Sequence, residues 1–313
     1  MQAIHPPGAS AASPKPGPRR LSVLRSAGRL VRGWHLLSLD APTVAATWCA
    51  AFMSVIGVPL SRPSAHWPVT FLCLATWLCY LGDRIQDARS AGDASELRAR
   101  HHFYGTWWRT RRASLVALIS VVAIVCAITG LLGLSLPLFV DYVALTLVSL
   151  LYFAWVHTGR ERNARVLAKE AAVAIIFALG CILPAWSSAS TFLRFQLAPA
   201  GMLFGLLCWL NCVAIERWEG RGIVSLRAHP STQWAARHLS ALLIASALAA
   251  AALAVWRHAS GRPTALAPYL ACAFMLLAAL ERFRQRLSVD SLRIFADVAL
   301  LTPLLWFAAK IST

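Results

Sequence analysis

Apolar residues form long runs along most of the chain, and polar residues are concentrated in the stretches between those runs. The runs cover approximately residues 43–60, 66–81, 113–133, 136–156, 168–187, 192–214, 238–256, 263–280 and 291–309. Several have about 16 to 22 residues, close to the length that a helix needs to cross the hydrocarbon core of a bilayer. At that depth only helices and closed barrels satisfy the backbone polar groups. The pattern therefore predicts an all-α integral membrane protein in which residues 34–313 form a bundle of nine transmembrane helices.

Residues 1–33 differ from the rest of the chain, because they are rich in Pro, Ser and Gly and carry several basic residues. Such a segment buries too little apolar surface to fold, so we predict a disordered basic tail. Over the whole chain 58% of residues are hydrophobic and 14% are charged, a composition that does not suit a soluble domain. All eight cysteines lie in apolar runs, so no disulfide framework is expected.

The basic residues define an orientation for the predicted helices. The chain has 30 Lys and Arg against 13 Asp and Glu, a formal net charge of +17. All but five of the 30 fall in the N-terminal tail or in alternate loops; the five are Arg62, Arg194, Arg257, Arg262 and Lys310. The positive-inside rule then places the N-terminus in the cytosol and the C-terminus outside, in a multi-pass protein of the cell (inner) membrane. We expect a lipid bilayer as the partner and no nucleic acid, because the basic residues form no continuous face.

Acidic residues are also confined to one side, since every acid except Asp141 falls in the predicted cytosolic loops or cytosolic helix halves. Asp83 and Asp87 end the second run at i,i+4 spacing, and Glu216 and Glu219 end the sixth run at i,i+3 spacing, so each pair shares a helix face. Two facing carboxylate pairs would repel one another unless a divalent cation lay between them. Carboxylate oxygens are the ligands that Mg²⁺ prefers, and Mg²⁺ also takes phosphate oxygens.

Neutralisation by neighbouring bases is the alternative interpretation of the two acidic pairs. The bases concerned are Arg84, Arg89, Arg217 and Arg221. A similar choice arises for Asp297 in the ninth run. An ionisable residue within a membrane is a candidate functional group, but Arg293 one turn earlier is a possible i,i+4 partner.

The order of these features resembles the UbiA superfamily of intramembrane prenyltransferases. Its members have nine helices, a cytosolic N-terminus and two Asp-rich motifs, which follow helices two and six. Asp83-Arg84-x-x-Asp87 is similar to the latter half of the first motif, Asn-Asp-x-x-Asp-x-x-x-Asp. Cys79 and Tyr80 stand at the positions of its leading Asn-Asp.

The second motif and three further positions extend the resemblance over residues 34–310. Glu216-x-x-Glu219 takes the place of Asp-x-x-Asp, and Ile223 stands where a third acid commonly follows. Tyr152 near the end of the fourth run, Lys169 at the start of the fifth and Gly180 within the fifth also fit the family pattern.

The resemblance implies magnesium-dependent transfer of an isoprenyl chain from a prenyl diphosphate to a hydrophobic acceptor, either aromatic or lipid-like. The implied catalytic and Mg²⁺-binding residues are Asp83, Asp87, Glu216 and Glu219. The implied substrate-binding residues are Arg84, Tyr152, Lys169 and Asn211. Mg²⁺ would neutralise the charge that develops on the departing pyrophosphate, so no protein nucleophile is needed.

Three other classes remain as alternatives. A transporter or permease also places charged residues inside a helix bundle, and it would contain a repeat of broken helices. A CDP-alcohol phosphotransferase also uses clustered Asp residues, but the sequence lacks its Asp-Gly-x-x-Ala-Arg start. A catalytically inactive UbiA-like membrane protein is the third alternative.

Overall fold

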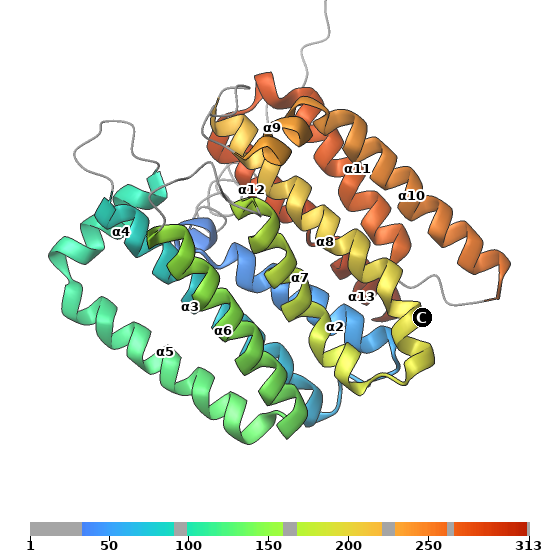
Figure 1. Cartoon of the computed structure of the whole chain (residues 1–313), viewed down its shortest axis with the longest axis horizontal. Helices are drawn as coiled ribbons and strands as arrows, with labels where there is room; N and C mark the ends of the chain where they lie inside the picture. The colour runs from blue at the N-terminus through green and yellow to red at the C-terminus, as the bar shows by residue number, and fades with distance from the viewer. Residues whose placement is uncertain (1–32, 91–98, 159–167, 221–228, 262–265, 312–313) are drawn as a thin grey trace, which may run out of the picture.

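The computed structural model of the chain describes residues 33–90, 99–158, 168–220, 229–261 and 266–311, and every regular element in these ranges is helical (Figure 1). The α-helices are α2 (Asp40–Val55), α3 (Pro63–Ser90), α4 (Ala99–Thr110), α5 (Arg112–Gly133), α6 (Leu136–Thr158), α7 (Lys169–Ser188), α8 (Thr191–Glu219), α9 (Pro230–Arg237), α10 (Leu239–Ala259), α11 (Ala267–Phe283), α12 (Val289–Ala299) and α13 (Pro303–Ile311), with a 3₁₀ turn η2 (Arg284–Arg286). The predicted all-α fold is confirmed. The predicted N-terminal tail lies outside the described residues, apart from Gly33.

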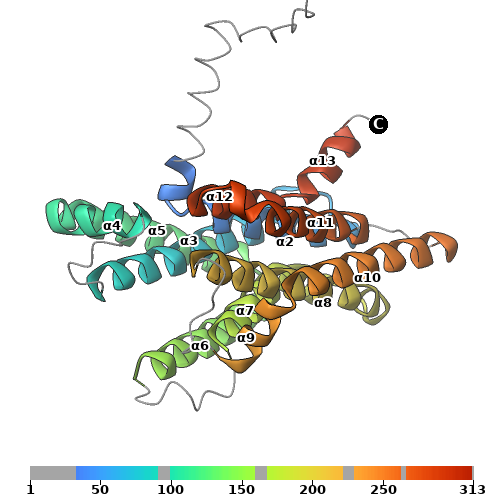
Figure 2. The same cartoon turned by 90° about the horizontal axis from the view of Figure 1, so that it is seen from above.

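Each of the nine predicted apolar runs falls mainly on one long helix or, for the last run, on the pair α12 and α13. Four helices, α5, α7, α8 and α10, are long and apolar enough to cross a membrane, and α12 with α13 forms a fifth candidate that is bent by 46°. Figure 2 shows α13 turning away from the line of α12. These helices indicate a multi-pass membrane protein, while the number of nine spans stays a prediction.

Helix α2 lies in the middle of the bundle and packs against α3, α7 and α12. Helix α8 packs against α7, α10, α11 and α12. The two groups meet at Trp48 of α2, whose indole stacks on Phe204 of α8 with ring centroids 4.3 Å apart, and Phe52 contacts the same phenyl ring at 5.7 Å. All three side chains are completely buried. This aromatic cluster therefore joins the N-terminal helices to the central helix α8.

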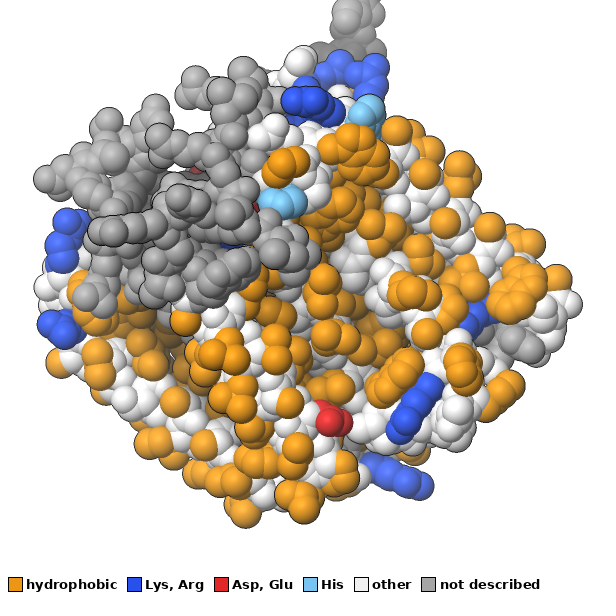
Figure 3. Space-filling view, in the orientation of Figure 1, with side chains coloured by type: hydrophobic (Ala, Val, Ile, Leu, Met, Phe, Trp, Pro, Cys, Tyr) orange, Lys and Arg blue, Asp and Glu red, His pale blue; other side chains and the backbone are white. Residues whose placement is uncertain are grey.

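The outermost helices carry apolar side chains that face away from the bundle. On α5, Leu131 and Leu132 are 67% and 78% exposed, and α6 and α10 carry large exposed apolar residues such as Leu151 and Val255. Figure 3 shows hydrophobic side chains over most of the described surface on that face. A surface of this kind suits lipid rather than water. The bundle core is therefore held by close packing between helices, as is usual in a bilayer.

One close approach gives a test of this packing. Gly133, the last residue of α5, lies so near Trp67 of α3 that a Cβ atom at position 133 would sit 2.5 Å from indole Cγ. We expect Gly133→Ala to lower the free energy of unfolding by about 1–3 kcal/mol, because the indole or α5 must shift. The measurement is the thermal unfolding midpoint of the detergent-purified chain. In the control Gly82→Ala the new methyl group meets nothing within 4 Å; equal midpoints for the two variants would contradict the prediction.

Candidate functional site

Three of the residues predicted for the site come together where α3 approaches α7. Asp83 lies two turns before the end of α3, and its Oδ2 is 3.5 Å from Arg84 Nη1. Its Oδ1 is 3.9 Å from the Nζ of Lys169, the first residue of α7. Both the Asp83 and Lys169 side chains keep contact with solvent, at 24% and 43% exposure. The structure therefore assembles an acid and two bases from two different helices.

The N-terminus of α7 adds to the positive character of this region. The residue that precedes the helix is Ala168, which has no side-chain group that could cap the first backbone N–H groups. Uncapped N–H groups and the helix dipole both favour an anion at such an end. Glu170 in the first turn accepts a hydrogen bond from Thr232 Oγ1 at 2.8 Å, which ties α7 to α9. Lys169, Arg84 and the α7 N-terminus together suit phosphate oxygens.

The end of α8 presents the second set of predicted residues. Glu219 forms an ion pair with Arg293 of α12, and both side chains are largely buried. Glu216, one turn earlier, is half-buried and forms no ion pair with another described residue. Asn211 is 8% exposed, and its Oδ1 has no hydrogen-bond partner within the described part of the chain. The C-terminal part of α8 thus offers the Glu216 carboxylate and the buried Asn211 Oδ1, neither of which is bound by another described side chain.

Other predicted residues lie apart from this group or outside the described ranges. Arg217 pairs with Glu281 of α11, with 3.3 Å between Nε and Oε1, so it serves a different acid from the two at the end of α8. Tyr152 is half-buried on α6, a helix that packs against α7. The side chains of Asp87, Arg89 and Arg221 lie outside the described residues.

The acids of α3 and α8 belong to the same end of the bundle. Both helices pack against α7, and Tyr80 of α3 lies near Cys212 of α8. Asp83, Glu216 and Glu219 do not form a cluster of three ligand atoms within 4.8 Å among the described residues. Their donors, with Asn211 Oδ1, are nevertheless all oxygens, which is the ligand chemistry of Mg²⁺. These oxygen ligands are divided between α3 and α8. A diphosphate between the two helices fits that arrangement, because Mg²⁺ commonly joins protein carboxylates to phosphate oxygens.

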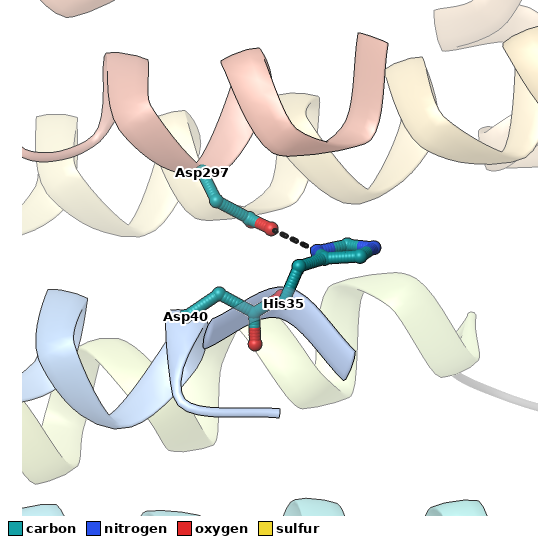
Figure 4. Close-up of side chains that lie close together, drawn as sticks. All are labelled: His35, Asp40 and Asp297. Atoms are coloured by element: carbon teal, nitrogen blue, oxygen red, sulfur yellow. Dashed lines mark ion pairs between the residues drawn. The ribbon is translucent and has the colours of Figure 1, made fainter. Parts of the chain in front are cut away.

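A second polar cluster, which we call the His35 triad, consists of His35, Asp40 and Asp297. The Nδ1 atom of His35 is 2.9 Å from Asp40 Oδ2 and 3.8 Å from Asp297 Oδ2. Figure 4 shows the Asp297 side chain reaching from α12 toward the imidazole, which is carried by the segment before α2. The three side chains are 8%, 4% and 17% exposed. The Arg293 guanidinium, one turn before Asp297, points to Glu219 instead.

A tight turn brings His35 back against Asp40. Ser38 has φ = 55°, the one positive φ at a non-glycine residue in the described chain. Ser38 N–H donates to His35 O at 3.1 Å and Leu39 N–H donates to Trp34 O at 3.0 Å, the two bonds of a helix-ending motif that usually has glycine at the turning position. Sequence reasoning singled out Asp297 but missed its partners His35 and Asp40, because the i,i+5 spacing of those two residues does not place them on one helix face.

No family model, curated protein or solved structure matches this chain. Similarity to a protein of known function therefore adds nothing to the geometry.

Proposed function

We propose that the chain is a UbiA-type prenyltransferase with nine spans, a cytosolic N-terminus and an outer C-terminus. In this proposal it transfers an isoprenyl chain from a prenyl diphosphate to a hydrophobic acceptor within the cell (inner) membrane. The observation that carries the proposal is the contact between Asp83 of α3 and Lys169 at the N-terminus of α7, at the end of the bundle where α8 presents Glu216. In this proposal Asp83 and Lys169, from separate helices, act on the same diphosphate, Asp83 through Mg²⁺ and Lys169 directly.

Each residue has a role that follows from its chemistry. Asp83, Asp87, Glu216 and Glu219 are the ligands we assign to Mg²⁺, and Glu219 would exchange its partner Arg293 for the ion. When bound, Mg²⁺ would neutralise the charge on the departing pyrophosphate. Lys169 and Arg84 donate charge-assisted hydrogen bonds to the diphosphate and orient it. Lys169 can turn toward the substrate because its side chain is 43% exposed and its contact with Asp83 is long, at 3.9 Å.

Two further residues are assigned to substrate binding. The Asn211 carboxamide lies in the interior at the α8 end with its oxygen available, so it can accept a hydrogen bond from a bound acceptor or complete a cation shell. Tyr152 on α6 is placed in the substrate group on the resemblance, as an aromatic surface for the isoprenyl chain. An apolar chain of this kind suits the interior of the bundle, whose core is built mainly from Ala and Leu with a few Phe and Trp.

A transporter is the second candidate, and one observation favours it. Helices α12 and α13 form a broken span that is bent by 46°, and its first half carries Arg293 and Asp297. Broken helices with ionisable residues line the substrate sites of many transporters. This candidate expects translocation of a solute across a vesicle membrane and no magnesium-dependent affinity for prenyl diphosphates.

The deciding experiment measures equilibrium binding of radiolabelled farnesyl and geranylgeranyl diphosphate to the detergent-purified chain, with and without Mg²⁺. We expect saturable binding that requires Mg²⁺, and we expect Asp83→Asn and Glu216→Gln each to weaken it at least about tenfold, which corresponds to roughly 1.4 kcal/mol. The physical reason is that each variant removes one charged oxygen ligand while it preserves side-chain shape.

Asp141→Asn is the matched control, because Asp141 is an exposed acid on α6 that we assign to the outer side. It should bind the diphosphate as the wild-type chain does. Binding that is independent of Mg²⁺, or equal in the wild type and both site variants with all three proteins folded, would contradict the proposal. The transporter candidate would then be tested next by solute uptake into proteoliposomes.

A further inference from the structure

The His35 triad gathers ligand atoms that the proposed transferase site does not use. One imidazole nitrogen and two carboxylate oxygens, from His35, Asp40 and Asp297, lie within 4.8 Å of one another. They come from the segment before α2, from the first residue of α2 and from the last turn of α12. We propose that these three residues bind one divalent first-row transition-metal ion, of which Mn²⁺ and Zn²⁺ are examples. This inference does not depend on the proposed function.

The distances within the triad suit metal binding. Ligand atoms that each bind a metal at about 2.1 Å lie roughly 3–3.5 Å apart in tetrahedral or octahedral sites. The distances of 2.9 Å and 3.8 Å from His35 Nδ1 to the two carboxylate oxygens lie on either side of that range. The other oxygen of Asp40 accepts a hydrogen bond from Ala41 N–H at 3.0 Å, which orients the carboxylate. Such support for a ligand from a neighbouring group is usual in metal sites.

Charge supplies a second argument for a cation. The triad brings two carboxylates together in a region with little access to solvent, and a divalent cation is a suitable counter-charge for two carboxylates. Asp40 at the start of α2 is favoured by its helix dipole, but Asp297 lies near the carbonyl end of α12, where a negative charge is disfavoured. Arg84 contributes positive charge to the same neighbourhood, since Tyr80 lies near Arg84, Asp40 and Asp297, but Arg84 also pairs with Asp83.

The backbone supplies an independent observation. A serine with φ = 55° is uncommon, because side chains other than glycine crowd the backbone in this region. Outliers of this kind are unfavourable and occur preferentially at functional sites. Here the turn at Ser38 returns His35 to Asp40. Trp77 of α3 holds the same turn by donating an indole N–H to Leu37 O at 2.9 Å.

The ligand set also selects the kind of metal. The imidazole nitrogen favours Zn²⁺ and related ions over Mg²⁺, which prefers oxygen ligands alone, and the two carboxylates also suit Mn²⁺. Three protein ligands leave at least one coordination position for water or another ligand. The triad lies in electrostatic range of Tyr80, the residue that stands where the UbiA motif has its leading Asp. An ion there would place positive charge beside the region assigned to the diphosphate.

The test uses Mn²⁺ as the probe on the full-length, detergent-purified chain after removal of metals with a chelator. We expect a tightly held Mn²⁺ ion whose pulsed electron paramagnetic resonance spectrum contains a ¹⁴N coupling from a directly bound imidazole. His35→Gln should abolish that coupling and weaken Mn²⁺ binding at least about tenfold. In the matched control His66→Gln an exposed histidine of α3 is changed, and the coupling should persist.

The ¹⁴N coupling separates this proposal from the Mg²⁺ site, because Asp83 and Glu216 offer only oxygen. Asp83→Asn and Glu216→Gln should therefore keep the coupling even where they lose prenyl-diphosphate binding. If His35→Gln does not fold, Asp297→Asn gives the same information: weaker Mn²⁺ binding with the ¹⁴N coupling retained supports the proposal. A folded wild-type chain without the coupling, a coupling that survives His35→Gln, or unchanged affinity in Asp297→Asn would each overturn it and leave the triad as a hydrogen-bonded acid–base group.

Discussion

Replacing Trp48 by alanine is expected to lower the free energy of unfolding of the detergent-purified chain by about 3–5 kcal/mol, the usual cost of removing a large aromatic side chain from a core. The Trp48 side chain is completely buried and stacks on Phe204. Its indole N–H also donates to Leu300 O at 2.7 Å, where the chain passes from α12 to α13. The variant therefore creates a cavity and leaves a buried carbonyl without its donor.

A less severe change at the same position separates these two causes. Trp48→Phe keeps most of the aromatic contact with Phe204 but removes the N–H donor, so it should cost about 1–3 kcal/mol. Trp256→Ala is the control for loss of a tryptophan, since Trp256 is 54% exposed on α10 and should change little. The measurement is unfolding by denaturant, followed by tryptophan fluorescence and circular dichroism. Equal stability of Trp48→Ala and Trp256→Ala would show that the aromatic cluster does not hold the bundle together.

This prediction also bears on the His35 triad. Leu300 follows the last turn of α12, three residues after Asp297. By holding Leu300 O, Trp48 of α2 fixes the end of α12 relative to the helix that begins with Asp40. We therefore expect Trp48→Phe to weaken Mn²⁺ binding at the triad while it leaves the chain folded.

Replacing Glu281 by alanine is the second change with a large expected effect, again about 3–5 kcal/mol. The Glu281 carboxylate, only 4% exposed, accepts a hydrogen bond from Trp218 Nε1 at 2.7 Å and pairs with Arg217 and Arg284. Alanine leaves an indole donor and two positive charges in a poorly hydrated place. The loss of stability arises mainly because the Trp218 N–H and the two guanidinium groups are left without an acceptor, rather than from the loss of the ion-pair attraction itself.

Glu281→Gln provides the graded control. The amide oxygen of glutamine can still accept from Trp218, but the negative charge that faces Arg217 and Arg284 is gone. We expect a loss between those of the wild type and the alanine variant, measured by the same denaturant titration. A glutamine variant as unstable as the alanine variant would mean that charge alone matters, and an alanine variant as stable as the wild type would refute the prediction.

The Glu281 group anchors the part of α8 that carries Glu216 and Glu219, because Arg217 and Trp218 lie between those two acids. Its removal should therefore also reduce binding of prenyl diphosphate at temperatures where the chain remains folded. This coupling links the stability of α11 to the proposed site on α8 without any contact between Glu281 and the substrate.

Sequence pattern alone predicts much of the local structure of this chain. Long apolar runs predict helices because a chain in lipid must satisfy its own backbone hydrogen bonds, and the described residues contain no strand. Lys169 begins α7, as its place at the start of an apolar run indicates. The eight cysteines are all free, in agreement with the absence of a predicted disulfide framework.

Helix ends were less predictable, because polar residues continue a helix beyond its apolar part. The run at 192–214 indicates only the apolar part of α8, and the helix continues to Glu219, in agreement with the predicted helix face of Glu216 and Glu219. The run at 291–309 predicts one continuous helix, whereas the structure breaks it between Ala299 and Pro303. A proline without a backbone N–H permits such a break. The carbonyl at the break is then held by Trp48, a partner from the other end of the sequence.

The amino-acid pattern was enough to predict which segments are helical and apolar, because these properties depend on neighbouring residues and on lipid. Which charges meet depends instead on how the helices pack. Arg217 binds Glu281 and Arg293 binds Glu219, although each base also has other acids nearby in sequence. His35 meets Asp297 for the same reason, since the meeting requires α12 to pack against α2 and the turn at Ser38 to return the imidazole. Ion pairing depends on which helices pack against each other, and the spacing of residues along the sequence does not predict that packing.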